Sequence, residues 1–231
     1  QSVESHPMSC QVMLFSEFPF IFKRQLAYKG REKIRYITYL CREKYFLTMR
    51  KTINCFIPYM ESTAAEQTIH ALKESSIVNK IYLLNIEPNK TLSTPDGCEI
   101  LPVDSLTSSK TMKMIAEKAD TPYILLYTKT SALELAYKAL ERMTDFLQDR
   151  ECGMVYADHH EWKNGEKKKH PVNDYQPGSV RDDFDFGPLL IFNRTEFILA
   201  SLQMTEERKY AALYELRLFL TLHSHLVHIN E

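Results

Sequence analysis

The side chains of this chain that can do chemistry gather in one polar stretch between Gly153 and Asn193. Two apolar, β-rich runs at 154–156 and 188–192 bracket a loop. The loop holds the carboxylates and imidazoles of Asp158, His159, His160, Glu161, Asp174, Asp182, Asp183 and Asp185. Because rigid strands position the groups that a loop exposes, we expect binding or proton transfer here and a scaffold role for the rest of the chain.

The three aspartates before the second run have two interpretations. Asp182, Asp183 and Asp185 can supply a proton acceptor, since like charges that lie close together raise one another's pKa. Alternatively, they cap the turn before the strand at Pro188. The sequence leaves both interpretations open.

The histidines can be interpreted as metal ligands or as ordinary surface residues. In the run 158–161, neighbours on a strand point to opposite faces, so only alternate members can meet one ion. On a β-like run, His223 and His225 share a face and His228 does not. The basic run 167–170 is expected at an exposed hairpin tip, with acceptor or phosphate contact as the alternative. We predict no metal site.

Composition limits the class of protein. The 231 residues carry a formal net charge of −1, which allows one sizeable core, and no apolar run approaches the roughly 20 residues that cross a bilayer. The cysteines are odd in number, scattered and without a CxxC pair, which argues against a disulfide scaffold or a structural zinc: Cys10, Cys41, Cys55, Cys98 and Cys152. We expect a cytoplasmic protein with reduced cysteines.

A basic, aromatic segment precedes the main pattern. Residues 23–51 contain ten Lys or Arg against two Glu, interleaved with tyrosines. Such a segment can lie on an anionic membrane surface or touch nucleic acid, or it can be a solvated helix. The solvated helix or an ill-ordered extension is the main interpretation, and peripheral contact with the inner face of a membrane is the alternative; we expect no nucleic-acid partner. We assign residues 1–51 to a basic, helical N-terminal extension and 52–231 to the main domain. Two alternatives stay open: that residues 1–48 precede the natural start, and that a C-terminal portion is missing.

From residue 52 onward, short β-rich runs alternate with helical ones. The expected strands are 53–57, 80–84, 99–103, 123–127, 154–156, 188–192 and 225–229, and the expected helices are 64–74, 108–119, 133–146, 195–202 and 210–222. Apolar strands linked by helices are typical of a parallel sheet covered on both faces, so the fold class is α/β. Ligands of such sheets bind beyond the carboxyl ends of the strands. The chain has six glycines and neither GxGxxG nor GxxxxGK[ST], which argues against a dinucleotide fingerprint and a P-loop.

Several segments resemble family 2 glycosyltransferases of the GT-A fold. INCFIPYMESTAAEQTIHALKES followed by NKIYLLN is similar to that family's opening strand, helix and second strand, and TPYILLYTKT to the strand that carries its Asp-x-Asp metal motif. GMVYADHHEWKNGEKKKHPVNDY is similar to a later strand and hairpin, and YAALYELRLFLTLHSHLVHINE to the final helix and strand. DYQPGSVRDDFDFGPLLIFN resembles an uncharacterised bacterial branch. The resemblance covers about 52–231 and implies a nucleotide-sugar transferase in bacterial polysaccharide biosynthesis.

The resemblance also shows where this chain departs from the family. Thr128-Lys129-Thr130 replaces Asp-x-Asp and cannot give two carboxylates to Mn²⁺ or Mg²⁺, so we expect no cofactor and a diphosphate held by Lys129 instead. Ala212-Leu213 stands where the family has the Glu-Asp of its catalytic base, which leaves Glu215.

The resemblance implies roles for individual residues. The expected substrate-binding residues are Pro58, Tyr59, Glu61, Asn85, Lys129 and Asp158, and the expected catalytic residues are Asp182, Asp183, Asp185 and Glu215. For each, the alternative is a loop cap or a solvated charge. The expected partners are a nucleotide-sugar donor and a glycan or lipid-linked acceptor. The second hypothesis is a GT-A-like domain that binds nucleotide-sugar, glycan or protein without turnover.

Overall fold

A computed structural model describes residues 51–87, 92–149, 151–163, 165–178, 180–181 and 183–230. The predicted N-terminal extension therefore lies outside the described residues, apart from Lys51, and so does Asp182. No helix within the described ranges has the length and apolarity needed to cross a membrane.

The centre of the described fold is a seven-stranded sheet in the order β3-β2-β1-β4-β8-β5-β9. Its strands are β1 (Ile53–Pro58), β2 (Val78–Asn85), β3 (Cys98–Pro102), β4 (Tyr123–Tyr127), β5 (Cys152–Ala157), β8 (Leu189–Asn193) and β9 (His225–Ile229). β8 pairs antiparallel with both β4 and β5, and all the other pairings are parallel. The prediction of a mostly parallel α/β sheet is confirmed.

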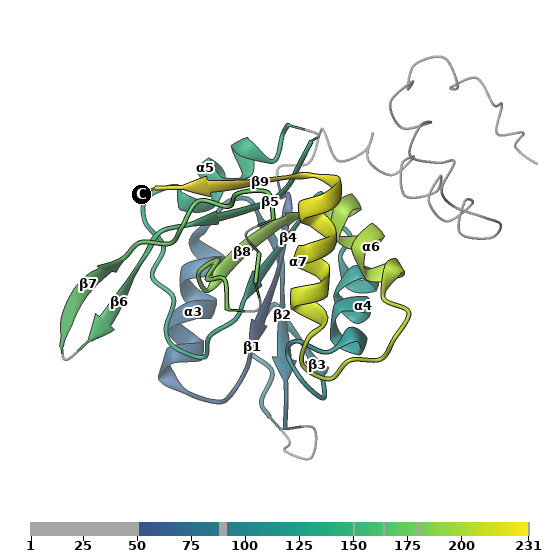
Figure 1. Ribbon diagram of the computed structural model, residues 1–231. Coiled ribbons are helices and arrows are strands. Elements are labelled where there is room, and N and C mark those ends of the chain that lie inside the picture. Colours follow the sequence, from purple (N-terminus) through teal and green to yellow (C-terminus); the bar gives the residue numbers. More distant parts are fainter. Residues whose placement is uncertain are drawn as a thin grey trace, which may run out of the picture. The chain divides into compact units, whose positions relative to one another are not determined.

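Helices cover both faces of this sheet (Figure 1). One layer holds α3 (Thr63–Glu74) and α5 (Ala139–Phe146), and the other holds α4 (Ser109–Lys118), α6 (Arg194–Gln203) and α7 (Ala212–His223). All six residues of β1 are buried, because helices cover both faces of this strand, and all of them except Asn54 are apolar. Cys55 and Ile57 pack towards α3 and α5, whereas Phe56 stacks on Tyr82 on the opposite face.

The sequence sets where most helices begin. The side-chain oxygens of Ser62, Ser108 and Asn193 accept the backbone N–H of Ala65, Thr111 and Thr195, respectively. Each cap satisfies an amide that has no partner within its helix.

The predicted helix 133–146 is wrong in its first half. Helix α5 begins only at Ala139, after Lys138 in the left-handed region at φ 51°. The preceding segment runs along α3, where the Leu133 amide donates to the Thr68 hydroxyl at 3.0 Å. Tertiary contact thus overrides an amphipathic pattern that favours a longer helix.

A two-stranded hairpin of β6 (His159–Lys163) and β7 (Glu166–His170) stands off the main sheet (Figure 1). It is antiparallel, and its register pairs His159 with His170 and Lys163 with Glu166. The run 167–170, expected at the hairpin tip, is instead its second strand. The hairpin follows directly on β5 and thereby carries the histidine-rich run away from the end of that strand.

Candidate functional site

The candidate site lies at the carboxyl rim, by which we mean the sheet edge where the parallel strands end. From β1 the chain moves outward to β2 and β3 and then returns to β4 on the other side of β1. This reversal makes the β1/β4 boundary a topological switch point, where open α/β sheets bind ligands. Lys129 follows β4 directly, and β8 begins at the same rim because it runs antiparallel.

Glu161 is the centre of the charged groups at this rim. Its Oε1 accepts from the Lys129 ammonium at 2.6 Å, and its Oε2 lies 2.9 Å from the Lys163 ammonium. The Lys129 contact, followed by the Lys163 contact, holds the pKa of Glu161 well below its usual range. One carboxylate therefore faces two ammonium groups, which come from β6 and from the loop after β4.

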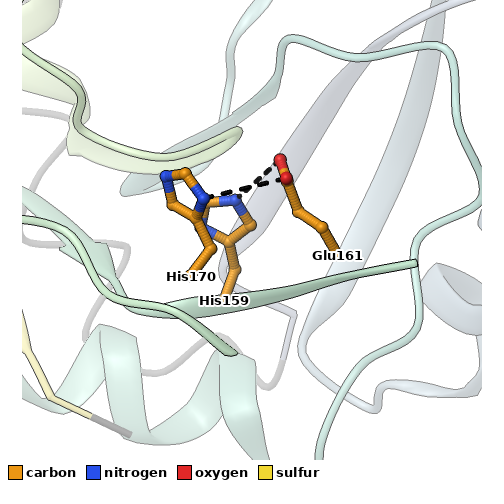
Figure 2. Close-up of side chains that lie close together, drawn as sticks. All are labelled: His159, Glu161 and His170. Carbon is orange, nitrogen blue, oxygen red and sulfur yellow. Dashed lines mark hydrogen bonds and ion pairs between the residues drawn. The ribbon is translucent and has the colours of Figure 1, made fainter. Parts of the chain in front are cut away.

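Two imidazoles face the same carboxylate (Figure 2). His159 Nε2 lies 3.4 Å from Glu161 Oε1, and His170 Nδ1 lies 3.7 Å from Oε2. His159 and Glu161 share a face because they are two residues apart on β6, and His170 is the cross-strand neighbour of His159, with ring centroids 4.6 Å apart. Burial, only partly offset by Glu161, lowers the pKa of His159, so its neutral form predominates at pH 7. His159 Nδ1 is buried and has no hydrogen-bond partner among the residues that the structure describes.

Asp185 joins this cluster from the segment before β8. Its Oδ2 lies 3.0 Å from His170 Nε2, and its Oδ1 accepts the Gly187 amide at 2.8 Å. Burial acts to raise the pKa of Asp185, but the Gly187 amide and His170 outweigh it and lower the pKa. The predicted rise through neighbouring carboxylates is wrong for Asp185, because its recorded partners are an amide and an imidazole.

Asp183 is separate from this cluster. Its carboxylate lies 3.3 Å from Arg181 Nε, and its side chain is 69% exposed. Its recorded contact is an exposed ion pair within the loop.

Asp158 belongs to a second cluster. Its carboxylate, 5% exposed, lies 2.9 Å from His228 Nε2 and 3.1 Å from Lys169 Nζ, and it accepts the Val172 amide at 2.9 Å. Burial acts to raise its pKa, but the Val172 amide, Lys169 and His228 together lower it to about 2. His228 also contacts Asp174 at 2.6 Å. This arrangement ties β5, β7 and β9 together, and none of the contacts recorded for Asp158 reaches Lys129.

The predicted binding residues after β1 and β2 make internal hydrogen bonds. The Tyr59 hydroxyl donates to the Ser93 carbonyl at 3.1 Å, and Glu61 accepts both the amide and the hydroxyl of Ser93. Asn85, which is buried, accepts the Glu87 amide at 2.8 Å. Pro58 is buried as the last residue of β1. These contacts hold the loop after β2 against the end of β1, which agrees with the loop-cap alternative.

Glu215 lies in the first turn of α7. Its carboxylate accepts from Arg208 Nε at 2.9 Å. Two residues further on, the Arg217 guanidinium lies 5.0 Å from the Phe186 ring, and burial lowers its pKa. Among the contacts recorded in the described ranges, none joins Glu215 directly to Lys129 or to Asp185.

The sequence reasoning missed His170 and the closeness of Arg217 to Phe186. A signal for His170 was present: Asn164-Gly165 is the dipeptide that favours two-residue hairpin turns. A two-residue turn at 164–165 pairs 163 with 166 and therefore 159 with 170, which is the observed register. Arg217 carries no such local signal, because its contact joins α7 to the distant segment before β8.

The sheet order and the helical layers match the GT-A-like nucleotidyltransferase fold. The chain is similar to 4-diphosphocytidyl-2C-methyl-D-erythritol synthase from Anaerococcus prevotii, with TM-score 0.52 and 11% identity, covering 79% of this chain and 90% of that one. It is also similar to glucosyl-3-phosphoglycerate synthase from Mycobacterium tuberculosis in complex with uridine diphosphate, with TM-score 0.44 and 10% identity, covering 78% and 70%. No family model and no curated protein matches the sequence.

Proposed function

We propose that this domain binds a nucleotide-diphosphate sugar at the carboxyl rim and transfers the sugar to a glycan or lipid-linked acceptor. The observation that carries the proposal is the position of Lys129. Its ammonium follows β4 at the switch point, is about half exposed, and is connected through Glu161 and His170 to Asp185. A cation and acid–base groups from three segments thus lie at the rim where open α/β sheets bind ligands.

A diphosphate can compete for Lys129 at a limited cost. Glu161 has a second ammonium partner in Lys163, so its charge stays compensated when Lys129 turns to a phosphate oxygen. The interaction of an ammonium with phosphate is a charge-assisted hydrogen bond, which is roughly twice as strong as a neutral one. In this proposal the Lys129 ammonium stabilises the leaving diphosphate, and no divalent cation is needed at Thr128-Lys129-Thr130.

Glycosyl transfer also needs a group that takes the proton of the acceptor hydroxyl. In the proposal this group comes from the aspartates of residues 182–185. Asp185, which is held ionised by the Gly187 amide and His170, has the required protonation state. Its lowered pKa makes it a weak base, so we expect slow transfer. A bacterial, cytoplasmic setting and membrane contact through residues 23–51 belong to the same proposal.

A second function, binding without turnover, is favoured by a specific observation. The Glu215 carboxylate is held by Arg208, and Thr128, beside Lys129, carries a hydroxyl that donates to the Pro188 carbonyl and no carboxylate. A domain of this kind would still hold the nucleotide-sugar through Lys129 and would show no transfer or hydrolysis.

The two functions separate in one pair of measurements on the full chain. UDP- and GDP-sugars are first screened by thermal shift without added metal, and a rise in the unfolding midpoint is expected for at least one of them. The sugar that binds is then incubated with the protein, and release of nucleotide diphosphate is measured. Release that is lost in Asp185→Asn supports the transferase, whereas binding without any release supports the binding module. The proposal fails if no nucleotide-sugar changes the midpoint.

A further inference from the structure

We infer that His159, Glu161 and His170, here called the hairpin triad, form a binding site for a divalent transition-metal ion. The three side chains each offer one ligand atom, and these atoms all lie within 4.8 Å of one another. They come from one face of the β6–β7 hairpin and converge on a common point (Figure 2). The site is distinct from Thr128-Lys129-Thr130 and needs no nucleotide.

The spacing of the triad is that of ligands around an ion. With metal–ligand bonds of about 2.1 Å in a tetrahedron, neighbouring donor atoms lie about 3.4 Å apart. The observed separations from the Glu161 oxygens are 3.4 Å to His159 Nε2 and 3.7 Å to His170 Nδ1. Both exceed the 2.7–3.2 Å range of ordinary N–H···O hydrogen bonds. The two imidazoles thus lie around the carboxylate at ligand spacing rather than in tight pairs with it.

The contact behind His170 is an independent observation that points to a metal. An imidazole that ligates through one nitrogen almost always donates its other N–H to a carboxylate, a carbonyl or water. Here His170 turns Nδ1 towards the triad and Nε2 towards Asp185 at 3.0 Å. Asp185 is itself fixed by the Gly187 amide. The carboxylate–imidazole pair is therefore already oriented for ligation through Nδ1.

The ligand types select the class of ion. Two imidazoles and one carboxylate suit Zn²⁺ and its first-row neighbours, whereas Mg²⁺ and Ca²⁺ prefer sets made of oxygens alone. Three protein ligands leave at least one position open, as in catalytic zinc sites. Zn²⁺ is therefore the ion to test first.

The ammonium groups of Lys129 and Lys163 allow the direction of a change in metal affinity to be predicted. Both lie on the Glu161 carboxylate, so an incoming ion must displace at least one of them. Removing Lys129 should therefore strengthen metal binding, because it removes a competing cation and a repulsive charge. A variant that is merely damaged would not bind the ion more tightly.

The test is calorimetric titration of the full chain with Zn²⁺. We expect one saturable site, at least tenfold weaker in His159→Gln and in His170→Gln, and 10- to 100-fold weaker in Asp185→Asn, since outer carboxylates contribute about that much. His160→Gln is the matched control, because His160 lies between His159 and Glu161 in the sequence but on the opposite face of β6. The Zn²⁺ affinity of this variant should equal that of the wild type. Lys129→Met should bind Zn²⁺ more tightly than the wild type.

Two results would overturn the inference. One is the absence of saturable Zn²⁺ binding in both the wild type and Lys129→Met. The other is an unchanged affinity in the double variant His159→Gln/His170→Gln, which would place the ion elsewhere in the chain. Neither result bears on nucleotide binding, which is measured without metal.

Discussion

At the scale of single residues, one buried carboxylate of the polar stretch, Asp158, joins three segments of the fold. Asp158 is buried and joins an amide of the segment after β7, a lysine of β7 and a histidine of β9. Its pKa of about 2 lies below the ordinary value of 3.8, so the folded state prefers the ionised form. The sequence alone could not show that the partners of Asp158 come from β7 and β9.

We expect Asp158→Asn to lower the free energy of unfolding by about 1–3 kcal/mol at pH 7, because the ion pairs with Lys169 and His228 are lost. Asp183→Asn is the matched control, since its exposed charge should contribute less than about 0.5 kcal/mol. Urea unfolding measures both. Equal stabilities of the two variants would contradict the structural role of Asp158.

The same carboxylate gives stability a pH dependence. Because the folded pKa is lowered, its contribution is fully present above the unfolded pKa and is lost as the pH falls from about 5 to about 2. The wild type should therefore lose stability over this window more steeply than Asp158→Asn. Urea midpoints measured at pH 7, 5 and 3 test this, and parallel curves would rule it out.

At the scale of elements, the turn before β8 brings Asp185 to the hairpin. Gly187 lies at φ 74°, and a Cβ there would come within 3.2 Å of the Ala157 carbonyl oxygen and 3.4 Å of His159 Nδ1. The turn is therefore packed directly against the end of β5 and the start of β6. Only glycine adopts this conformation at such close approach without strain.

We expect Gly187→Ala to destabilise the protein by about 1–3 kcal/mol, since it combines an unfavourable φ with a backbone contact that must move. Gly97→Ala is the control, because Gly97 has a similar φ of 72° but open space around it. Thermal unfolding of the two variants isolates the contribution of close packing. Equal shifts in the midpoint would mean that the turn at Gly187 is not packed as described.

Element prediction succeeded where local pattern and environment agree. The predicted strands at 123–127 and 225–229 have the observed bounds. The first is a continuous apolar run of five residues, which fits a strand covered on both faces. It failed for residues 133–138, where contact with α3 holds the chain out of a helix. The antiparallel direction of β8 was equally hidden, because strand direction depends on the path of the chain between β5 and β8 and not on the strand's own residues.

At the scale of the whole molecule, the α/β class followed from alternating strands and helices, whereas the site did not follow from any one motif. Residues from β4, the hairpin and the segment before β8 meet only because the sheet order places these elements together at the carboxyl rim. Register and sheet order are needed to recognise such a site. The Asn164-Gly165 dipeptide indicates the register of the β6–β7 hairpin, whereas no residue pattern directly indicates the order of the strands in the sheet.

The extension hypothesis is tested by deletion. Removal of residues 1–48 should leave a domain that unfolds cooperatively, because the core described for residues 51–230 contains its own sheet and both helical layers. Circular dichroism and thermal unfolding of the deletion variant check this. Loss of soluble expression would contradict it.

The most direct test of the central claim measures the affinity of a nucleotide-diphosphate sugar by calorimetry, without metal, for the wild type, Lys129→Ala and Lys113→Ala. Lys113 is an exposed lysine of α4. This helix belongs to the layer of α4, α6 and α7, and the β6–β7 hairpin is not part of that layer. We predict that Lys129→Ala weakens binding about tenfold or more, as loss of a charge-assisted hydrogen bond requires, and that Lys113→Ala leaves it unchanged. An unchanged affinity in Lys129→Ala would contradict the assignment of the diphosphate to this rim.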